Sequence, residues 1–150
     1  METDSLTFTR VIAAPPARVF ELYTDSDARQ IWNSPGEDFT TTVTHPAQTA
    51  PGVRETALVT AENEPDTVVH TDWTTVTPDA VAYAETLEVE GAPLAASFTC
   101  ATFEDADGGT RLTLEIALTS FAGPEMLEGY KMGCTAAFDA LVAAAAGANA

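Results

Sequence analysis

Glu85 is the residue of this sequence that is best placed to carry chemistry. In the segment 81–90, bulky apolar residues alternate with smaller or acidic ones, and Glu85 shares the parity of Tyr83 and the other large apolar residues. Successive side chains of a β-strand point to opposite faces, so an apolar face directed inward would carry Glu85 inward as well. A carboxylate among apolar groups is costly to ionise, so its pKa would rise and it could act as an acid or base. The alternatives are a bulge that turns Glu85 to solvent, or pairing with Arg54 or Arg111.

His70 and Asp72 offer a second acid–base arrangement in the fourth predicted strand. The two residues have the same parity, and an inward-facing His–Asp pair would orient the imidazole and raise its basicity, as a general base requires. Glu85 with His70 or Tyr83 would then support a small enzyme of cyclase or hydrolase type. Trp73 lies on the opposite face and has the larger apolar area to bury, so we expect the Trp73 face inward and His70 exposed.

Other catalytic chemistries have no support in the sequence. Cys100 and Cys134 have no cysteine or histidine at metal-ligand spacing, so we expect two free, buried thiols and no metal site. The sequence contains no glycine-rich phosphate loop, nucleophile elbow, zinc-binding helix motif or paired Cys-x-x-Cys. We therefore expect neither a cofactor nor a metal ion.

The remaining pattern predicts the elements that must position these groups. Alternating apolar and polar residues predict a first strand over 6–13, and helical spacing predicts two short helices between Pro16 and Trp32. Six further strands are predicted over 39–44, 53–61, 68–76, 81–90, 94–103 and 111–120. A long helix follows from Pro124, and its apolar stripe consists of Leu127, Tyr130, Cys134, Phe138 and Leu141.

Strands that are grouped together and followed by one long helix indicate the α+β class with a mainly antiparallel sheet. A single helix must cover one face of about seven strands, so the sheet has to curve around the helix. Such an arrangement often leaves a space that side chains do not fill. We therefore expect an apolar ligand cavity between the sheet and the C-terminal helix.

The composition predicts one domain over residues 1–150, because 45% of the residues are hydrophobic and no apolar stretch is long enough to span a bilayer. The chain carries 23 acidic residues against 6 basic ones, a net charge of −17, which would repel nucleic acid and anionic membranes. The acidic, polar start is unlike a secretory signal, so we expect a cytoplasmic protein. Few lysines with many acidic residues are typical of a salt-loving source, and a GC-rich genome produces the same bias; both explanations stay open.

Four segments resemble one superfamily. The segment 10–20 (RVIAAPPARVF) resembles the opening of START-like, helix-grip domains, the SRPBCC superfamily. Within it, the match is to bacterial and archaeal homologues of the activator of the ninety-kilodalton heat-shock protein ATPase. The tryptophan and proline at 32–35, the hairpin 108–113 (GGTRLT) and the segment 128–130 (EGY) resemble that family, with Tyr130 in place of its usual tryptophan.

The resemblance implies a helix-grip fold with a pocket for a hydrophobic or amphipathic small molecule. It implies no single reaction, because the relatives include lipid carriers, aromatic polyketide cyclases and co-chaperone domains. The sequence shows no complete catalytic set, so we expect a binding protein, either a monomer or a homodimer. One alternative is an enzyme that uses Glu85 with His70 or Tyr83. Another is an interaction domain for a chaperone, which predicts a filled interior and an exposed apolar patch.

The predicted cavity wall follows from the parity of each strand and from the helix stripe. In the strand 94–103, the face with Leu94, Phe98 and Cys100 carries the larger apolar side chains, and we expect it to point inward. Any one of these residues could be ordinary core. The predicted ligand-binding residues are Trp32, Phe39, Leu58, Trp73, Tyr83, Glu85, Phe98, Cys100, Leu114, Ile116, Met126, Tyr130, Cys134 and Phe138.

Overall fold

A computed structural model describes residues 1–45 and 49–147, and it contains the elements that the sequence predicts, in the predicted order. Strand β1 (Glu2–Ile12) precedes two helices, α1 (Pro16–Thr24) and α2 (Ser26–Trp32). The middle of the chain forms strands, which are β2 (Phe39–His45), β3 (Arg54–Ala61), β4 (Thr67–Thr77), β5 (Ala80–Val89), β6 (Ala92–Ala106) and β7 (Gly109–Ser120). The long helix α3 (Pro124–Gly147) follows.

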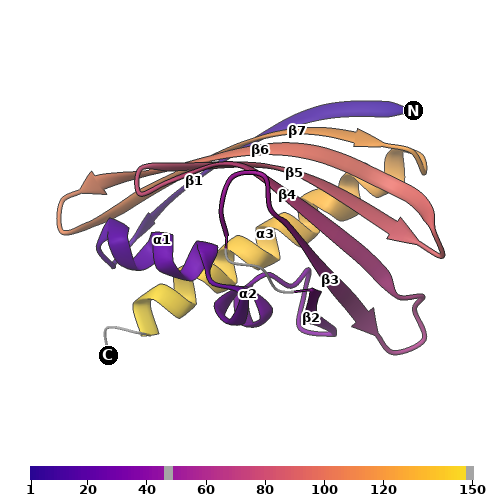
Figure 1. The fold of residues 1–150 in the computed structure, drawn as a ribbon, viewed down its shortest axis with the longest axis horizontal. Coiled ribbons are helices and arrows are strands. Elements are labelled where there is room, and N and C mark those ends of the chain that lie inside the picture. Colours follow the sequence, from indigo (N-terminus) through magenta and orange to yellow (C-terminus); the bar gives the residue numbers. More distant parts are fainter. Residues whose placement is uncertain (46–48, 148–150) are drawn as a thin grey trace.

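All seven strands form one sheet in the order β1-β7-β6-β5-β4-β3-β2, and every neighbouring pair is antiparallel. The sheet is curved, and α3 crosses its concave side, with α1 and α2 on that same side (Figure 1). This is the predicted α+β arrangement. Strand β1 begins earlier than the sequence predicts, because Glu2 to Ser5 continue the pairing with β7 although they bring few apolar side chains.

Local signals set the ends of the two short helices. Helix α1 begins at Pro16, where a missing N–H is harmless because the first helical N–H groups have no intrahelical partner. Helix α2 is capped by Asp25, whose carboxylate accepts a hydrogen bond of 2.8 Å from the Ala28 N–H. The indole of Trp32 closes α2 onto α1, because its N–H donates to the Leu22 carbonyl at 2.8 Å.

The tightly packed core lies at one end of the concave side. It is built mainly from β1, β6, β7, α1 and α3, and Trp32, Trp73 and Val81 join it from α2, β4 and β5. Its fully buried members include Ile12, Val19, Leu112 and Leu141. At the other end, β2 to β5 curve past the N-terminal half of α3 (Figure 1). The side chains on these strands are short, so this end of the molecule does not close.

Strand β6 corrects one prediction from the sequence. Its inward face carries Ala95, Ser97, Thr99, Ala101 and Phe103, all of them buried. The predicted inward residues Phe98 and Cys100 therefore lie on the outer face, where Phe98 is 43% exposed. The reason is space, because the small residue Ser97 of β6 lies against Tyr130 of α3 and leaves room for that large side chain.

Candidate functional site

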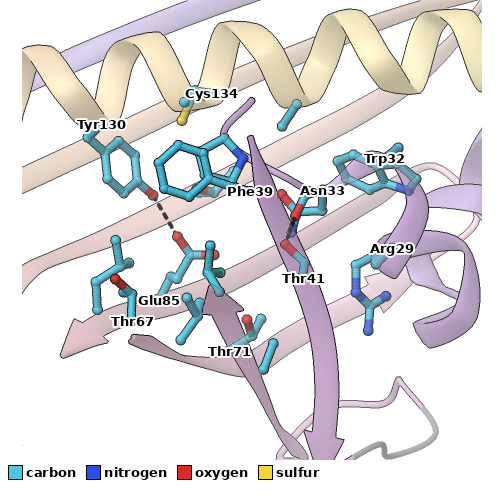
Figure 2. A pocket seen from close by; sticks show the side chains of 18 of the residues that line it. Arg29, Trp32, Asn33, Phe39, Thr41, Thr67, Thr71, Glu85, Tyr130 and Cys134 are labelled. Atoms are coloured by element: carbon cyan, nitrogen blue, oxygen red, sulfur yellow. Dashed lines mark hydrogen bonds between the residues drawn. The ribbon is translucent and has the colours of Figure 1, made fainter. Parts of the chain in front are cut away.

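A cavity of about 520 Å³ lies between the N-terminal half of α3 and strands β2 to β5. That volume is in the usual range for pockets that bind small organic molecules. Phe39 lines the cavity and is 37% exposed, so it stands at the edge of the cavity. Figure 2 shows polar side chains from the strands and α2 facing the helix residues Tyr130 and Cys134 across this space.

Most of the predicted wall residues do line the cavity, although their role in binding remains a prediction. Those that line it are Trp32, Phe39, Tyr83, Glu85, Ile116, Met126, Tyr130, Cys134 and Phe138.

Five predicted residues lie elsewhere. Leu114 is fully buried in the packed core, and Trp73 is buried behind Tyr83, with ring centroids 4.8 Å apart. Leu58, Phe98 and Cys100 are on the convex face of the sheet. The prediction for Leu58 was wrong because β3 is apolar on both faces near its centre. The neighbouring residues Ala57 and Val59 face the cavity instead.

The structure also brings polar residues to the wall that sequence reasoning missed. Threonines from several strands line it, together with the side chain of Asn33 and the pair formed by Arg29 and Glu55. Thr67 and Thr71 flank Val69 at alternating positions in β4, which is a signal that a search for polar residues at period two would have found. No local pattern could connect Arg29 with Glu55, because they lie on different elements.

Glu85 faces the cavity from β5 and is held by a short hydrogen-bond chain from α3. The Tyr130 hydroxyl donates to Oε1 of Glu85 at 2.8 Å, and the Ser97 hydroxyl lies 2.9 Å from the Tyr130 oxygen (Figure 2). Burial raises the pKa of Glu85, and the hydrogen bond from Tyr130 partly offsets that rise. The wall therefore presents a carboxyl group that holds its proton to a higher pH than an exposed glutamate does.

Arg29 and Glu55 form a buried ion pair at the α2 end of the cavity, and each is only 4% exposed. The Arg29 Nε donates to Glu55 Oε2 at 3.1 Å, a second guanidinium nitrogen contacts Oε1, and Nη1 donates to the Tyr23 carbonyl at 2.9 Å. Ser26 donates a further hydrogen bond of 2.7 Å to the same carboxylate. The guanidinium also stacks 5.0 Å from the Trp73 ring. Arg29 is the only basic residue in the described wall, and Glu55 already neutralises it.

Two tyrosines form a hydroxyl pair beneath Glu85. The Tyr23 and Tyr83 oxygens are 2.6 Å apart, and burial is the main cause that raises the pKa of both phenols. Both rings are therefore uncharged at neutral pH. They act as hydrogen-bonding groups, and neither supplies a phenolate nucleophile.

His70 lies on the convex face, so it does not meet Glu85. Its Nε2 is 2.5 Å from the Glu88 carboxylate and its Nδ1 is 3.0 Å from the Thr56 hydroxyl. Asp72 pairs with Arg54 through contacts of 2.7 and 2.9 Å and does not orient the imidazole. The Trp73 face points inward, as the sequence predicted. The alternative prediction, that His70 and Glu85 share one site, is wrong.

The cysteines differ from each other. Cys134 is half-buried in the cavity wall, where burial raises the pKa of its thiol to about 12 and leaves it protonated and unreactive. Cys100 is exposed on the convex face, which corrects the expectation that both thiols are buried. Within residues 1–45 and 49–147, no three His, Cys, Asp or Glu side chains are grouped so that they could hold a metal ion. No helix in the described part of the chain is long and apolar enough to cross a membrane.

Comparison with known proteins places this geometry in a family. The family model described as polyketide cyclase / dehydrase and lipid transport matches residues 3–146. Among solved structures, protein CV1439 from Chromobacterium violaceum is 21% identical with a TM-score of 0.82, over 94% of this chain and 96% of that one. Protein Mll3558 from Rhizobium loti is 20% identical with a TM-score of 0.82, over 95% and 96%. No curated protein matches the chain.

The heat-shock activator resemblance has a structural counterpart too. The AHSA1 protein from Silicibacter pomeroyi is 18% identical, with a TM-score of 0.74 over 93% of this chain and 96% of that one. Identities this low show a shared fold alone, whereas the family model covers nearly the whole sequence. The chain therefore belongs to the polyketide cyclase / dehydrase and lipid transport family, within the START-like, helix-grip SRPBCC superfamily.

Proposed function

We propose that this protein binds an apolar or amphipathic small molecule in the cavity between α3 and strands β2 to β5. The observation that carries the proposal is the cavity of about 520 Å³, much larger than the voids that packing leaves in a protein interior. Its wall combines aromatic and aliphatic side chains with a few fixed polar groups, which is typical of small-molecule sites. The family description, which includes lipid transport, supports the same function.

Small residues on α3 support the proposal because they keep the space open. Gly129 and Ala137 line the cavity, and a Cβ added at Gly129 would meet no atom within 4 Å. Glycine in a helix interior costs about 1 kcal/mol relative to alanine. Gly129 is itself exposed, so it stands at the open edge of the cavity, where a larger side chain would narrow the entrance.

The test is to fill the cavity from Gly129. We expect Gly129→Leu to keep the fold, with the helix stabilised by roughly 0.5–1 kcal/mol, and to weaken binding of the uncharged dye Nile red at least tenfold. Gly129→Ala is the matched control, and it should bind the dye as the parent protein does. Native mass spectrometry of both variants shows whether molecules that co-purify with the parent are lost only from Gly129→Leu. Equal binding by all three proteins would exclude the cavity as the site.

Catalysis is a second candidate function, favoured by one observation. Glu85 combines a pKa raised by burial with a position on the cavity wall, which are the requirements for a general acid or base. Tyr83, two residues away on the same face, is the available second group, whereas His70 is on the other side of the sheet. This alternative predicts that the molecule recovered from the cavity differs chemically from the molecule supplied, which product analysis of the same extracts decides. The chaperone-interaction alternative predicted a filled interior, and the cavity counts against it.

A further inference from the structure

The indole nitrogen of Trp73 is a buried hydrogen-bond donor without an acceptor. Trp73 is 2% exposed, and its Nε1 contacts no hydrogen-bond partner among the residues that the structure describes. The other tryptophan of the chain provides the contrast, because Trp32 Nε1 donates to the Leu22 carbonyl at 2.8 Å. A buried donor without a partner is costly, and native proteins rarely retain one without a reason.

The Trp73 ring borders a small recess that adjoins the main cavity. The recess has a volume of about 10 Å³, enough for roughly one oxygen atom. Apart from Tyr23 and Trp73, every residue that lines the recess also lines the main cavity, Glu85 and Tyr83 among them. A molecule in the main cavity can therefore place one small group in this recess.

The tyrosine hydroxyls and Arg29 beside the recess already have partners, whereas no side-chain hydrogen bond of Asn33 or Thr71 is seen in the described part of the chain. The Tyr23 and Tyr83 hydroxyls bond to each other at 2.6 Å, and Arg29 is saturated by Glu55 and the Tyr23 carbonyl. Glu85 is half-satisfied, because Tyr130 holds Oε1 whereas Oε2 has no donor in the described part of the chain. The unused groups around the recess thus include a buried donor, the Trp73 N–H, and a charged-type acceptor, the second oxygen of Glu85, with the Asn33 amide and the Thr71 hydroxyl beside them.

We propose that the recess recognises a hydroxyl group on an otherwise apolar ligand, an inference that rests on the proposed binding function. A hydroxyl oxygen accepts from the Trp73 N–H, and the hydroxyl proton is donated to Glu85 Oε2. The ammonium, ether and carboxylate groups each fail one of the two partners. An ammonium group has no lone pair for Trp73, an ether oxygen has no proton for Glu85, and a carboxylate meets the Glu85 carboxylate with no free cation nearby.

Nuclear magnetic resonance tests this on the unmodified protein, since its two tryptophans give two indole N–H signals. The probes are decanol, its methyl ether, decylammonium and decanoate, which share one apolar chain. We expect decanol to move the Trp73 indole proton downfield, as a new hydrogen bond does, and to leave the Trp32 signal nearly unchanged. Titrations should show decanol binding roughly five- to tenfold more tightly than its methyl ether, and decanoate binding most weakly.

Two variants identify the groups that recognise the hydroxyl. Trp73→Phe removes the donor and Glu85→Leu removes the acceptor, and each should reduce the preference for decanol over its methyl ether to about twofold or less. If the Trp73→Phe protein does not fold, the indole signals of the parent protein still decide the question.

The two ways of failing can be told apart. If none of the probes binds, the proposed function is wrong. If all four bind with similar affinity and the Trp73 signal stays in place, the cavity binds apolar molecules but the hydroxyl inference is overturned. A Trp73 signal that is already downfield without any probe, and does not move, would show that water alone occupies the recess and would overturn the inference as well.

Discussion

Glu85 shows how one buried carboxyl group can be tolerated inside an apolar cavity. Burying an ionised carboxyl group without partners costs much free energy. The fold lowers this cost with a hydrogen bond from Tyr130, whose hydroxyl also contacts Ser97. Three elements, β5, α3 and β6, therefore meet at this carboxyl. Because burial outweighs that hydrogen bond, the pKa of Glu85 lies above its ordinary value of 4.5.

This raised pKa predicts a specific pH dependence of stability. The folded protein holds the Glu85 proton at pH values where the unfolded chain has released it. The contribution of Glu85 is therefore fully present below about pH 4.5 and is lost as pH rises through the folded-state pKa. The loss amounts to about 1.4 kcal/mol for each pH unit by which the folded-state pKa exceeds the unfolded one. We expect urea denaturation of Glu85→Gln, compared with the parent from pH 4 to pH 8, to show the variant gaining in relative stability as pH rises.

A surface carboxyl provides the control for this measurement. Glu104 is exposed on β6, and Glu104→Gln should follow the parent protein at every pH. A difference between Glu85→Gln and the parent that stays constant across the range would mean that burial does not raise the pKa of Glu85. The role of Glu85 as a proton donor or acceptor would then lose its physical basis.

At the scale of elements, the ion pair between Arg29 and Glu55 fixes α2 against β3 and forms one end of the cavity. Removing one member of a buried pair leaves a charge without compensation, which typically costs 3–5 kcal/mol, whereas replacing both members with apolar residues is often nearly neutral. We expect Glu55→Gln to lower the free energy of unfolding by about 3 kcal/mol in chemical denaturation. The double variant Arg29→Met with Glu55→Leu should recover most of that loss.

The neighbouring surface pair is the matched control for the buried one. Arg54 and Asp72 form a two-point contact of 2.7 and 2.9 Å, and both side chains are exposed. Asp72→Asn should therefore cost less than about 1 kcal/mol, because exposed pairs contribute little. Equal losses from Glu55→Gln and Asp72→Asn would show that burial does not distinguish the two pairs.

The same elements explain how much the sequence could predict. In β7, Leu112 and Leu114 alternate with polar residues, and this pattern identifies the buried face of the strand without ambiguity. The apolar stripe of α3 identifies the buried face of the helix in the same way. Parity also placed Glu85 on the cavity side. It failed in β6 because four of the five inward side chains there are alanine, serine or threonine, so the larger apolar residues Phe98 and Cys100 misleadingly marked the outer face as the buried one.

Contacts between distant residues were beyond a pattern search. Arg29 and Glu55 come together because α2 packs against β2, the neighbour of β3 in the sheet, and in the sequence each residue looks like an ordinary surface charge. The recess beside Trp73 depends on how four elements meet around one ring. Such features depend on three-dimensional packing, so the periodicity of residues along the chain does not predict them.

At the scale of the whole molecule, the packed core and the cavity lie next to each other and share part of their walls. Residues of β1, β6, β7, α1 and the later turns of α3 pack the interior at one end, while β2 to β5 and the first turns of α3 enclose the cavity at the other. Gly133 helps to join the two parts, because a Cβ there would lie 3.1 Å from the Cβ of Pro35, in the segment that follows α2. Ile116, Tyr130 and Phe138 belong to both the core cluster and the cavity wall, so changes at these residues would affect binding and stability together.

The net charge of −17 is the other property of the whole molecule, and the structure shows how it is distributed. Most basic residues already have an acidic partner in the described chain, as in the pairs of Arg10 with Asp139, Arg18 with Glu21 and Lys131 with Asp4. Many acidic side chains on the surface thus have no cation to offset them. Their mutual repulsion opposes the compact state, and salt screens it.

We therefore expect stability to increase with salt. Between 10 mM and 1 M sodium chloride the screening length shortens from about 30 Å to about 3 Å, so repulsion between distant carboxylates vanishes, whereas the exposed ion pairs lose little because they contribute little. The melting temperature measured by circular dichroism should rise by roughly 5 °C or more, which corresponds to about 2 kcal/mol for a chain of this size. Sucrose, which strengthens burial without screening charge, provides the control and should give a smaller rise than salt. A melting temperature that falls with salt would mean that attractive pairs outweigh the repulsion, and an adaptation to high salt would then have no energetic support in this surface.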